Sequence, residues 1–146
     1  MTQRIVYFWQ YFVAITVFIC MMAVLQFFPS DYWMEVRSVN VKRAKIGQPI
    51  EMAVDRIINQ DFHATWLVTI RKWDGGWVTL CNAAGSGNYR TTARFPKDLT
   101  LDWWTWNQCK PLDAGRYQVE TVWNIDQLGL IPDKQITAMS NVFDVE

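Results

Sequence analysis

The chain has a single histidine, His63, among its 146 residues, and this scarcity excludes several kinds of site. A nucleophilic triad needs a base, which is most often a histidine, and a blue-copper site needs two histidines. The three cysteines include no Cys-x-x-Cys pair, so the common zinc-binding spacing is also missing. We therefore expect a protein that is not an enzyme and that holds no metal ion or other cofactor.

The sequence also lacks an excess of charge of either sign. Lys and Arg together number 14, Asp and Glu also number 14, and the formal net charge at pH 7 is zero. A protein that binds nucleic acid through the phosphates carries a strongly basic patch. We therefore expect no nucleic-acid partner. The aromatic fraction of 15% argues against a disordered chain.

Charge is absent altogether from Ile5 to Phe28, a run in which the strongly polar residues are Gln10, Thr16 and Gln26. At about 1.5 Å per residue, a helix of this length spans roughly 36 Å, enough to cross a hydrocarbon core of about 30 Å. The run predicts one transmembrane helix in contact with the lipid bilayer. Its three polar residues are candidates for hydrogen bonds to other membrane-protein subunits.

A cleaved signal peptide is the main alternative to a permanent span. The apolar region of a signal peptide is about 7 to 15 residues long and ends in a small-x-small site. The run here is longer, and Met22–Gln26 contains no Ala-x-Ala pattern. We favour an uncleaved signal anchor over cleavage and over a buried helix of a soluble domain. The expected division is a tail over 1–4, a transmembrane helix over 5–28, a juxtamembrane segment with the first strand over 29–45, and a β-sandwich over 46–146.

The signals for the orientation of the span in the membrane conflict. Basic residues are more numerous after the run than before it, where Arg4 stands alone, and a literal count places the following domain in the cytoplasm. However, Asp31 and Glu35 come first after the run, and short tails with one Arg commonly stay inside. We favour a cell inner membrane with a cytoplasmic N-terminus and a periplasmic or other extracytoplasmic domain.

Two of the cysteines, Cys81 and Cys109, lie in the polar part of the chain, whereas Cys20 lies in the apolar run. A disulfide between Cys81 and Cys109 would stabilise the fold by roughly 3 to 4 kcal/mol on the chain-entropy model. Such a bond persists only in an oxidising compartment, which agrees with export. Two unrelated free thiols are the alternative.

Residues 34–146 fall into short alternating runs separated by turn residues, the pattern of an all-β sandwich. In the first run, Met34, Val36 and Ser38 fall on one side and Val39 on the other. Asp74-Gly75-Gly76 predicts a tight hairpin turn. We expect seven to nine strands, at residues 34–41, 50–55, 65–72, 77–81, 89–95, 99–106, 117–123 and 136–145, with a loop of small residues at 83–88.

The segment Leu112–Val119 resembles the tyrosine corner of immunoglobulin-like and fibronectin-type sandwiches, in which a Tyr hydroxyl bonds back to the backbone. Ile46–Ile50 resembles the entry to their second strand, and Trp66 falls where their buried tryptophan commonly lies. The resemblance implies an immunoglobulin-like antiparallel β-sandwich in which Tyr117 and Trp66 are structural. Val119 stands where antibody-type domains carry a cysteine, so the likeness is one of fold, and fold alone does not set function.

The nine tryptophans exceed the needs of a small core. If residues 99–106 form a strand, alternation places Trp104 and Trp106 on one face and Trp103 on the other, so the three cannot all be buried together. Exposed aromatic surface indicates a partner. The candidates for partner contact are Trp73, Trp77, Trp104 and Trp106.

These observations favour a non-catalytic accessory or assembly subunit of a membrane protein complex. The alternative is a membrane-tethered glycan- or peptidoglycan-binding module that uses Trp104 and Trp106, since Asp102, Asn107 and Gln108 lie close by in sequence. For the tryptophans themselves, core packing without a partner is a further alternative. An enzyme is the third hypothesis for the function, and no feature of the sequence supports it.

Overall fold

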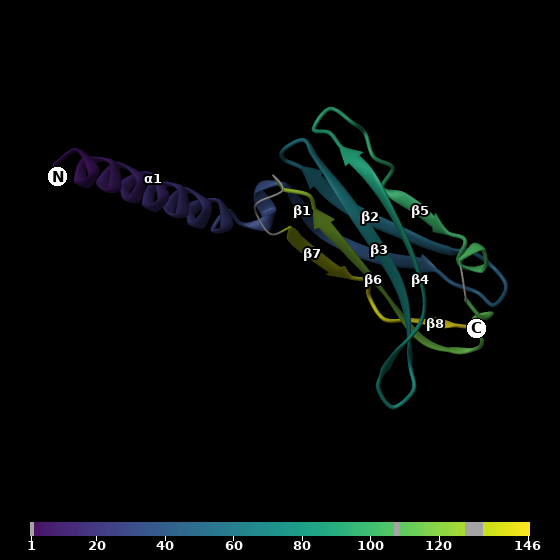
Figure 1. The fold of residues 1–146 in the computed structure, drawn as a ribbon. Coiled ribbons are helices and arrows are strands. Elements are labelled where there is room, and N and C mark those ends of the chain that lie inside the picture. Colours follow the sequence, from purple (N-terminus) through teal and green to yellow (C-terminus); the bar gives the residue numbers. More distant parts are fainter. Residues whose placement is uncertain (1, 107–108, 128–132) are drawn as a thin grey trace.

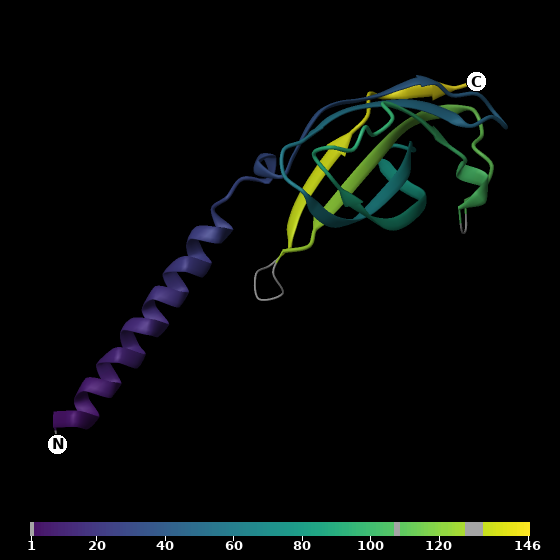
Figure 2. The same cartoon turned by 90° about the horizontal axis from the view of Figure 1, so that it is seen from above.

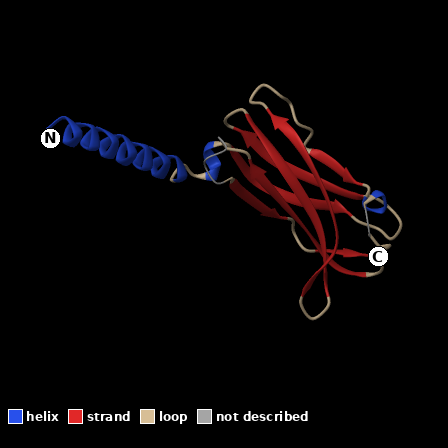
Figure 3. Cartoon of the chain, viewed as in Figure 1, coloured by secondary structure: helices blue, strands red, loops and turns tan. Residues whose placement is uncertain are grey.

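The computed structural model describes residues 2–106, 109–127 and 133–146 of the chain. In these residues one helix precedes eight strands, which form two antiparallel sheets (Figure 1 and Figure 3). The expected fold class, an all-β domain of seven to nine strands behind one apolar helix, is confirmed.

The helix α1 (Thr2–Gln26) projects away from the β-domain (Figure 2). Its segment Tyr7–Val24 is long and apolar enough to cross a membrane, and none of it is buried against the rest of the chain. Burial of apolar surface is what normally holds a helix on a globular domain. The segment Tyr7–Val24 therefore keeps its apolar side chains exposed in the described structure.

A short aromatic connection joins α1 to the β-domain. The 3₁₀-helix η1 (Ser30–Tyr32) follows almost directly, and its Tyr32 ring lies 5.1 Å from that of Phe28 and 5.3 Å from that of Trp33, between centroids. The Trp33 ring in turn lies 6.5 Å from Phe62, which is buried in the domain. The end of the helix is therefore linked to the core by successive ring contacts.

Two sheets make up the domain. The first sheet has the order β1-β2-β5 and consists of β1 (Met34–Arg43), β2 (Ile50–Ile58) and β5 (Asp98–Leu101). The second has the order β4-β3-β6-β7, with β8 also paired to β6, and consists of β3 (Phe62–Trp73), β4 (Trp77–Tyr89), β6 (Gly115–Ile125), β7 (Lys134–Met139) and β8 (Phe143–Val145).

The apolar faces of both sheets meet in two buried clusters. The larger includes Met52 and Val54 from β2 and Ile70 and Val119 from β3 and β6, and the second includes Phe62 from β3. Along one side the sheets are tied together, since the Val41 amide donates to Asn141 Oδ1 over 2.7 Å. The opposite side runs between β4 and β5, which end their sheets. A cavity between the sheets lies on that side.

The expected alternation along the first strand is wrong after Val36. The pairing of β1 with β2 shifts between Val36 and Ser38, which is a β-bulge. The extra residue turns the following side chains over, so that Val39 and Val41 are buried on the same face as Met34. Ser38 is exposed instead of facing the core.

Residues 83–88 do not form the expected loop, because β4 continues through them to Tyr89 and pairs with β3 throughout. Small residues are required on its inward face, where Gly85 lies opposite the large Trp66 side chain. The strand expected at 89–95 is also wrong, since Tyr89 is the last residue of β4. A run of Gly and Ala therefore marks a packed strand here.

The expected strand at 99–106 ends early, at Leu101, and the 3₁₀-helix η2 (Trp103–Thr105) follows. Strand alternation therefore does not govern the tryptophans in this segment. Trp103 is 4% exposed, and its indole N–H donates to the Gln48 carbonyl over 2.9 Å. The backbone of Trp104 lies in η2, but its side chain is outside the described part of the structure, as are Asn107 and Gln108.

Candidate functional site

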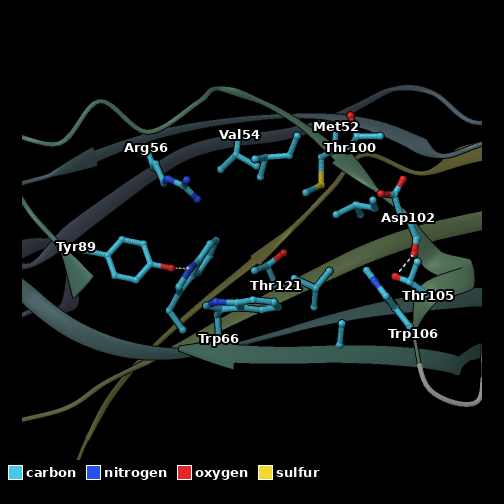
Figure 4. Close-up of a pocket in the computed structure, with 15 residues that line it drawn as sticks. Met52, Val54, Arg56, Trp66, Tyr89, Thr100, Asp102, Thr105, Trp106 and Thr121 are labelled. Atoms are coloured by element: carbon cyan, nitrogen blue, oxygen red, sulfur yellow. Dashed lines mark hydrogen bonds between the residues drawn. The ribbon is translucent and has the colours of Figure 1, made fainter. Parts of the chain in front are cut away.

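A cavity of about 400 Å³ lies between the sheets, on the side of the edge strands β4 and β5 (Figure 4). Its volume is in the range of small-molecule sites. Most of its walls are apolar or aromatic side chains that reach in from both sheets. The labelled view shows Arg56 and Tyr89 toward one end and Asp102 and Trp106 toward the other, with Trp66 between them.

The inward face of β4 creates this space. Ala83, Gly85 and Gly87 alternate on that face and carry almost no side chain, and the partly buried Trp66 of β3 lies against Gly85. Larger residues at these positions would fill the space. Trp66 is thus a wall of the cavity rather than the fully buried core tryptophan that we expected, whereas Trp123 is 2% exposed.

Arg56 is the one basic residue among those that line the cavity. Its Nε atom is buried and makes no hydrogen bond, and among the described residues no carboxylate forms an ion pair with it. Its guanidinium lies over the Phe95 ring, 5.1 Å from the centroid. Burial lowers the pKa of Arg56, and the nearby Tyr89 acts in the opposite direction.

Two further polar groups border the cavity. The Thr121 side chain is 4% exposed, and its hydroxyl makes no hydrogen bond. The Tyr89 hydroxyl accepts a hydrogen bond from Trp123 Nε1 over 3.1 Å, which leaves its own proton available to an acceptor. A buried polar group without a partner costs free energy, so these groups would gain from a ligand or from ordered water.

The hairpin that joins β3 to β4 presents a second aromatic surface. Trp73 is 45% exposed and packs edge-on against Trp77, with ring centroids 5.4 Å apart. Gly75 adopts a φ of +69°, as the expected tight turn requires. The hairpin tip points away from α1 (Figure 1), and Trp73 and Trp77 do not line the cavity, whereas Trp106 does.

The tyrosine corner is formed as the resemblance implies. The Tyr117 hydroxyl donates to the Asp113 carbonyl over 2.9 Å and lies 2.7 Å from the Asp113 carboxylate, which also binds Lys72 Nζ. The hydrogen bonds from Lys72 and Tyr117 lower the pKa of Asp113 to about 2. Burial and the Asp113 carboxylate raise the pKa of Tyr117. Tyr117 is fully buried and structural.

Cys81 and Cys109 form a disulfide with their Cα atoms 4.9 Å apart, while Cys20 is free and exposed on α1. The bond ties β4 to the segment that leads from η2 into the tyrosine corner. It therefore anchors the chain next to Trp106, which lines the cavity. A disulfide of this kind is typical of an oxidising compartment.

The three polar residues of the helix differ in their hydrogen bonding. Thr16 donates its hydroxyl to the Phe12 carbonyl over 2.9 Å within α1. The side chains of Gln10 and Gln26 are exposed and have no partner in the described part of the chain. Gln10 is therefore the stronger candidate for a contact with another span, since Gln26 is the last residue of the helix.

The sequence did not predict that the cavity would be lined by Arg56, Tyr89 and Thr121. It also did not predict the role of the small residues of β4. The alternation of β2 and β6 does place Arg56 and Thr121 on the inward face, and a charged or hydroxyl residue at an inward position is the available signal. Among the described residues, no group of three or more His, Cys, Asp or Glu side chains lies close enough together to hold a metal ion.

A family assignment would rest on the tyrosine corner and the order of the strands. Compared with known proteins, the chain matches no family model, no curated sequence and no solved structure. We therefore describe the chain by its architecture. It is a two-sheet antiparallel β-domain with one disulfide, preceded by an apolar N-terminal helix.

Proposed function

We propose that the chain is a non-catalytic, single-pass membrane protein, an accessory or assembly subunit of a membrane protein complex. One observation carries the proposal: the segment Tyr7–Val24 of α1 is apolar, and none of it is covered by the β-domain. Lipid tails can cover the apolar side chains of this segment, and the exposed Gln10 amide would gain from a polar partner in another span. The helix is then both an anchor and a contact surface.

The β-domain in this proposal is immunoglobulin-like. The sheet orders β1-β2-β5 and β4-β3-β6-β7 support it, since three strands face a sheet centred on two long antiparallel strands, and so does the Tyr117 hydrogen bond to Asp113. Domains of this architecture commonly serve as interaction modules, although fold alone does not set function. The exposed Trp73 of the hairpin offers this domain a contact residue for a partner.

The proposed location is a bacterial-type inner membrane with the N-terminus in the cytoplasm and the β-domain in the periplasm. The Cys81–Cys109 disulfide supports an oxidising compartment. An epitope tag after Glu146 tests the orientation, because the C-terminus lies at the end of the domain far from α1 (Figure 1). External protease should remove the tag in spheroplasts. Removal only after lysis would show the opposite orientation, with the C-terminus in the cytoplasm.

Photo-crosslinking in living cells tests the subunit role. A photoreactive residue at Gln10 or at Trp73 should give discrete adducts with another membrane protein, and the same probe at the outward-facing Ala84 of β4 should not. If neither position gives an adduct and the gently solubilised chain migrates alone, it is not a subunit.

A substitution in the helix separates a specific contact from general insertion. Gln10→Leu should weaken co-purification of the crosslinked partner, since it removes an amide that has no hydrogen-bond partner among the described residues. Val17→Leu, also on the exposed surface of α1, is the matched control and should leave co-purification unchanged. Equal loss in both variants would indicate a membrane-insertion defect instead.

The second candidate function, a membrane-tethered glycan- or peptidoglycan-binding module, is favoured by one observation. Trp106 and Trp66 both line the cavity, and Asp102 lies near Trp106 (Figure 4). Aromatic faces beside a carboxylate suit a sugar ring. Isolated peptidoglycan should then retain the full-length chain, and retention should be lost in Trp106→Ala but not in Trp73→Ala.

A further inference from the structure

We infer that the cavity between the sheets binds a small amphiphilic carboxylate, an apolar body that carries one carboxylate group at the Arg56 end. This site goes beyond the proposed subunit role and does not depend on it. Arg56 lines the cavity without an ion-pair partner among the described residues, and Tyr89 lines the same end with a hydroxyl proton to donate.

The polar groups at this end are donors that lack an acceptor. A guanidinium offers five N–H groups, and the Arg56 side chain makes no hydrogen bond within the described residues, while its Nε is buried. The Tyr89 oxygen already accepts from Trp123, so its remaining capacity is to donate. A carboxylate has acceptors only and can take two parallel N–H bonds from one Arg. It therefore supplies what both groups lack.

Charge at the two ends orients the ligand. Arg56 pairs with Val36 near the start of β1, so it lies toward α1, whereas Asp102 follows Leu101, which pairs with Ile50 at the other end of β2. The exposed Asp102 carboxylate repels an anion. A ligand with one negative group therefore binds with that group at the Arg56 end and its apolar part toward Trp106.

The walls between the two ends require an apolar body. Hydrocarbon and aromatic side chains dominate this stretch, and Thr100 and Thr121 are the polar residues among them. The apolar side chains that line it are Met52, Val54, Trp66, Val68, Leu99 and Leu101. A sugar carries hydroxyls on every edge and a peptide carries amides along its length, and both would leave polar groups unpaired against these walls. A hydrocarbon chain or an aromatic ring leaves none.

The position of the domain also favours this ligand. Tyr32 and Trp33 link Phe28, just after the end of α1, to Phe62. Phe62 stacks on Tyr89 with ring centroids 4.9 Å apart. The Arg56 end of the cavity is thus on the side of the domain nearest the apolar helix. Amphiphilic acids concentrate at a membrane surface, so the site lies where such molecules are available.

The test uses the full-length chain in lipid nanodiscs, with octanoate as the probe and octanol as its uncharged match. Octanoate should raise the unfolding temperature of the β-domain, and octanol should not. A terminally brominated octanoate should quench tryptophan fluorescence in a saturable way, since Trp66 and Trp106 line the cavity. Partition into the lipid is the same for every variant, so differences between variants report the site.

Arg56→Gln should weaken octanoate binding at least tenfold and change the unfolding temperature of the unliganded domain little. Among the described residues Arg56 has no ion pair to lose, and the loss of its contact with the Phe95 ring is offset because a buried unpaired Nε is removed. A residue kept for structure alone would instead destabilise the unliganded domain when it is replaced. Ala83→Leu provides a second variant that leaves Arg56 in place. It fills the cavity from β4 and should abolish binding, whereas Ala84→Leu on the outward face should not.

Several results would overturn the inference. Equal octanoate binding by the native chain and Arg56→Gln would show that the anion is not recognised there. Octanol that binds as well as octanoate would also show that the carboxylate is not recognised. Saturable binding of an oligosaccharide or of a peptide C-terminus, with none of octanoate, would assign the cavity to another ligand class.

Discussion

The indole of Trp66 lies directly against Gly85 of the neighbouring strand, so closely that a Cβ on Gly85 would stand 2.4 Å from Trp66 Cζ2. Ordinary van der Waals contact between carbon atoms begins near 3.4 Å, so an alanine at this position must move either the ring or the strand. Trp66 is bordered on its other side by the cavity.

We therefore expect Gly85→Ala to lower the free energy of unfolding by about 1–3 kcal/mol. Gly87→Ala is the matched control on the same strand, because its Cβ meets only Tyr89 Cε2, at 4.0 Å, and should change stability little. Denaturant unfolding of the full-length chain in nanodiscs measures both. Equal effects would mean that the contact with Trp66 does not decide the preference for glycine.

Thr121→Val should raise the free energy of unfolding by about 1 kcal/mol, because the buried hydroxyl makes no hydrogen bond and a methyl group of similar size replaces it. Thr121→Ser keeps the hydroxyl and removes the methyl group, and it should destabilise the domain. Loss of stability in Thr121→Val would indicate that ordered water satisfies the hydroxyl.

The disulfide should account for a large share of the stability. Reduction, or replacement of both Cys81 and Cys109 by alanine, should lower the free energy of unfolding by roughly 3 to 4 kcal/mol. Cys20→Ser, which alters the free thiol of α1, should leave the effect of reductant intact. If reductant does not change the unfolding midpoint of the native chain, the bond does not stabilise the domain.

The Asp113 carboxylate should make stability depend on acid pH. Its pKa is lowered from 3.8 to about 2 in the folded chain by hydrogen bonds from Lys72 and Tyr117. Between these values the unfolded chain binds more protons, so this contribution is fully present above about pH 4 and is lost as the pH falls toward 2. Denaturant unfolding at a series of pH values measures the slope.

Asp113→Asn should flatten that slope. Tyr117→Phe should flatten it in part, because it removes the Tyr117 hydrogen bond to the carboxylate and leaves those from Lys72. An unchanged slope in Asp113→Asn would assign the acid sensitivity to other carboxyl groups. Asp61, whose pKa is lowered by hydrogen bonds from Thr91, is the next group to test.

Much of the fold could be predicted, because it depends on local signals. The charge-free run marks α1, and the Asp74-Gly75-Gly76 turn marks the hairpin with its φ of +69° at Gly75. The Tyr117 corner is also local, since its hydroxyl reaches back four residues to Asp113. Each of these features is decided by residues that are close together in the chain.

What could not be predicted depends on contacts between distant segments. Gly85 is typical of a loop until Trp66 is known to lie across it, nineteen positions earlier in sequence. Trp103 leaves the strand pattern because its indole N–H reaches the Gln48 carbonyl. The cavity itself combines both sheets, and no single stretch of sequence shows that Arg56 and Tyr89 approach the same space.

Successive ring contacts from Phe28 to Phe62 connect the helix to the domain without a long linker. With α1 in a membrane, the domain becomes a spacer whose height is set by the length of its strands. The 11 residues of β6 measure about 36 Å at roughly 3.3 Å each. A partner that touches Trp73 at the hairpin must therefore extend to that height itself or approach from a layer beyond the membrane.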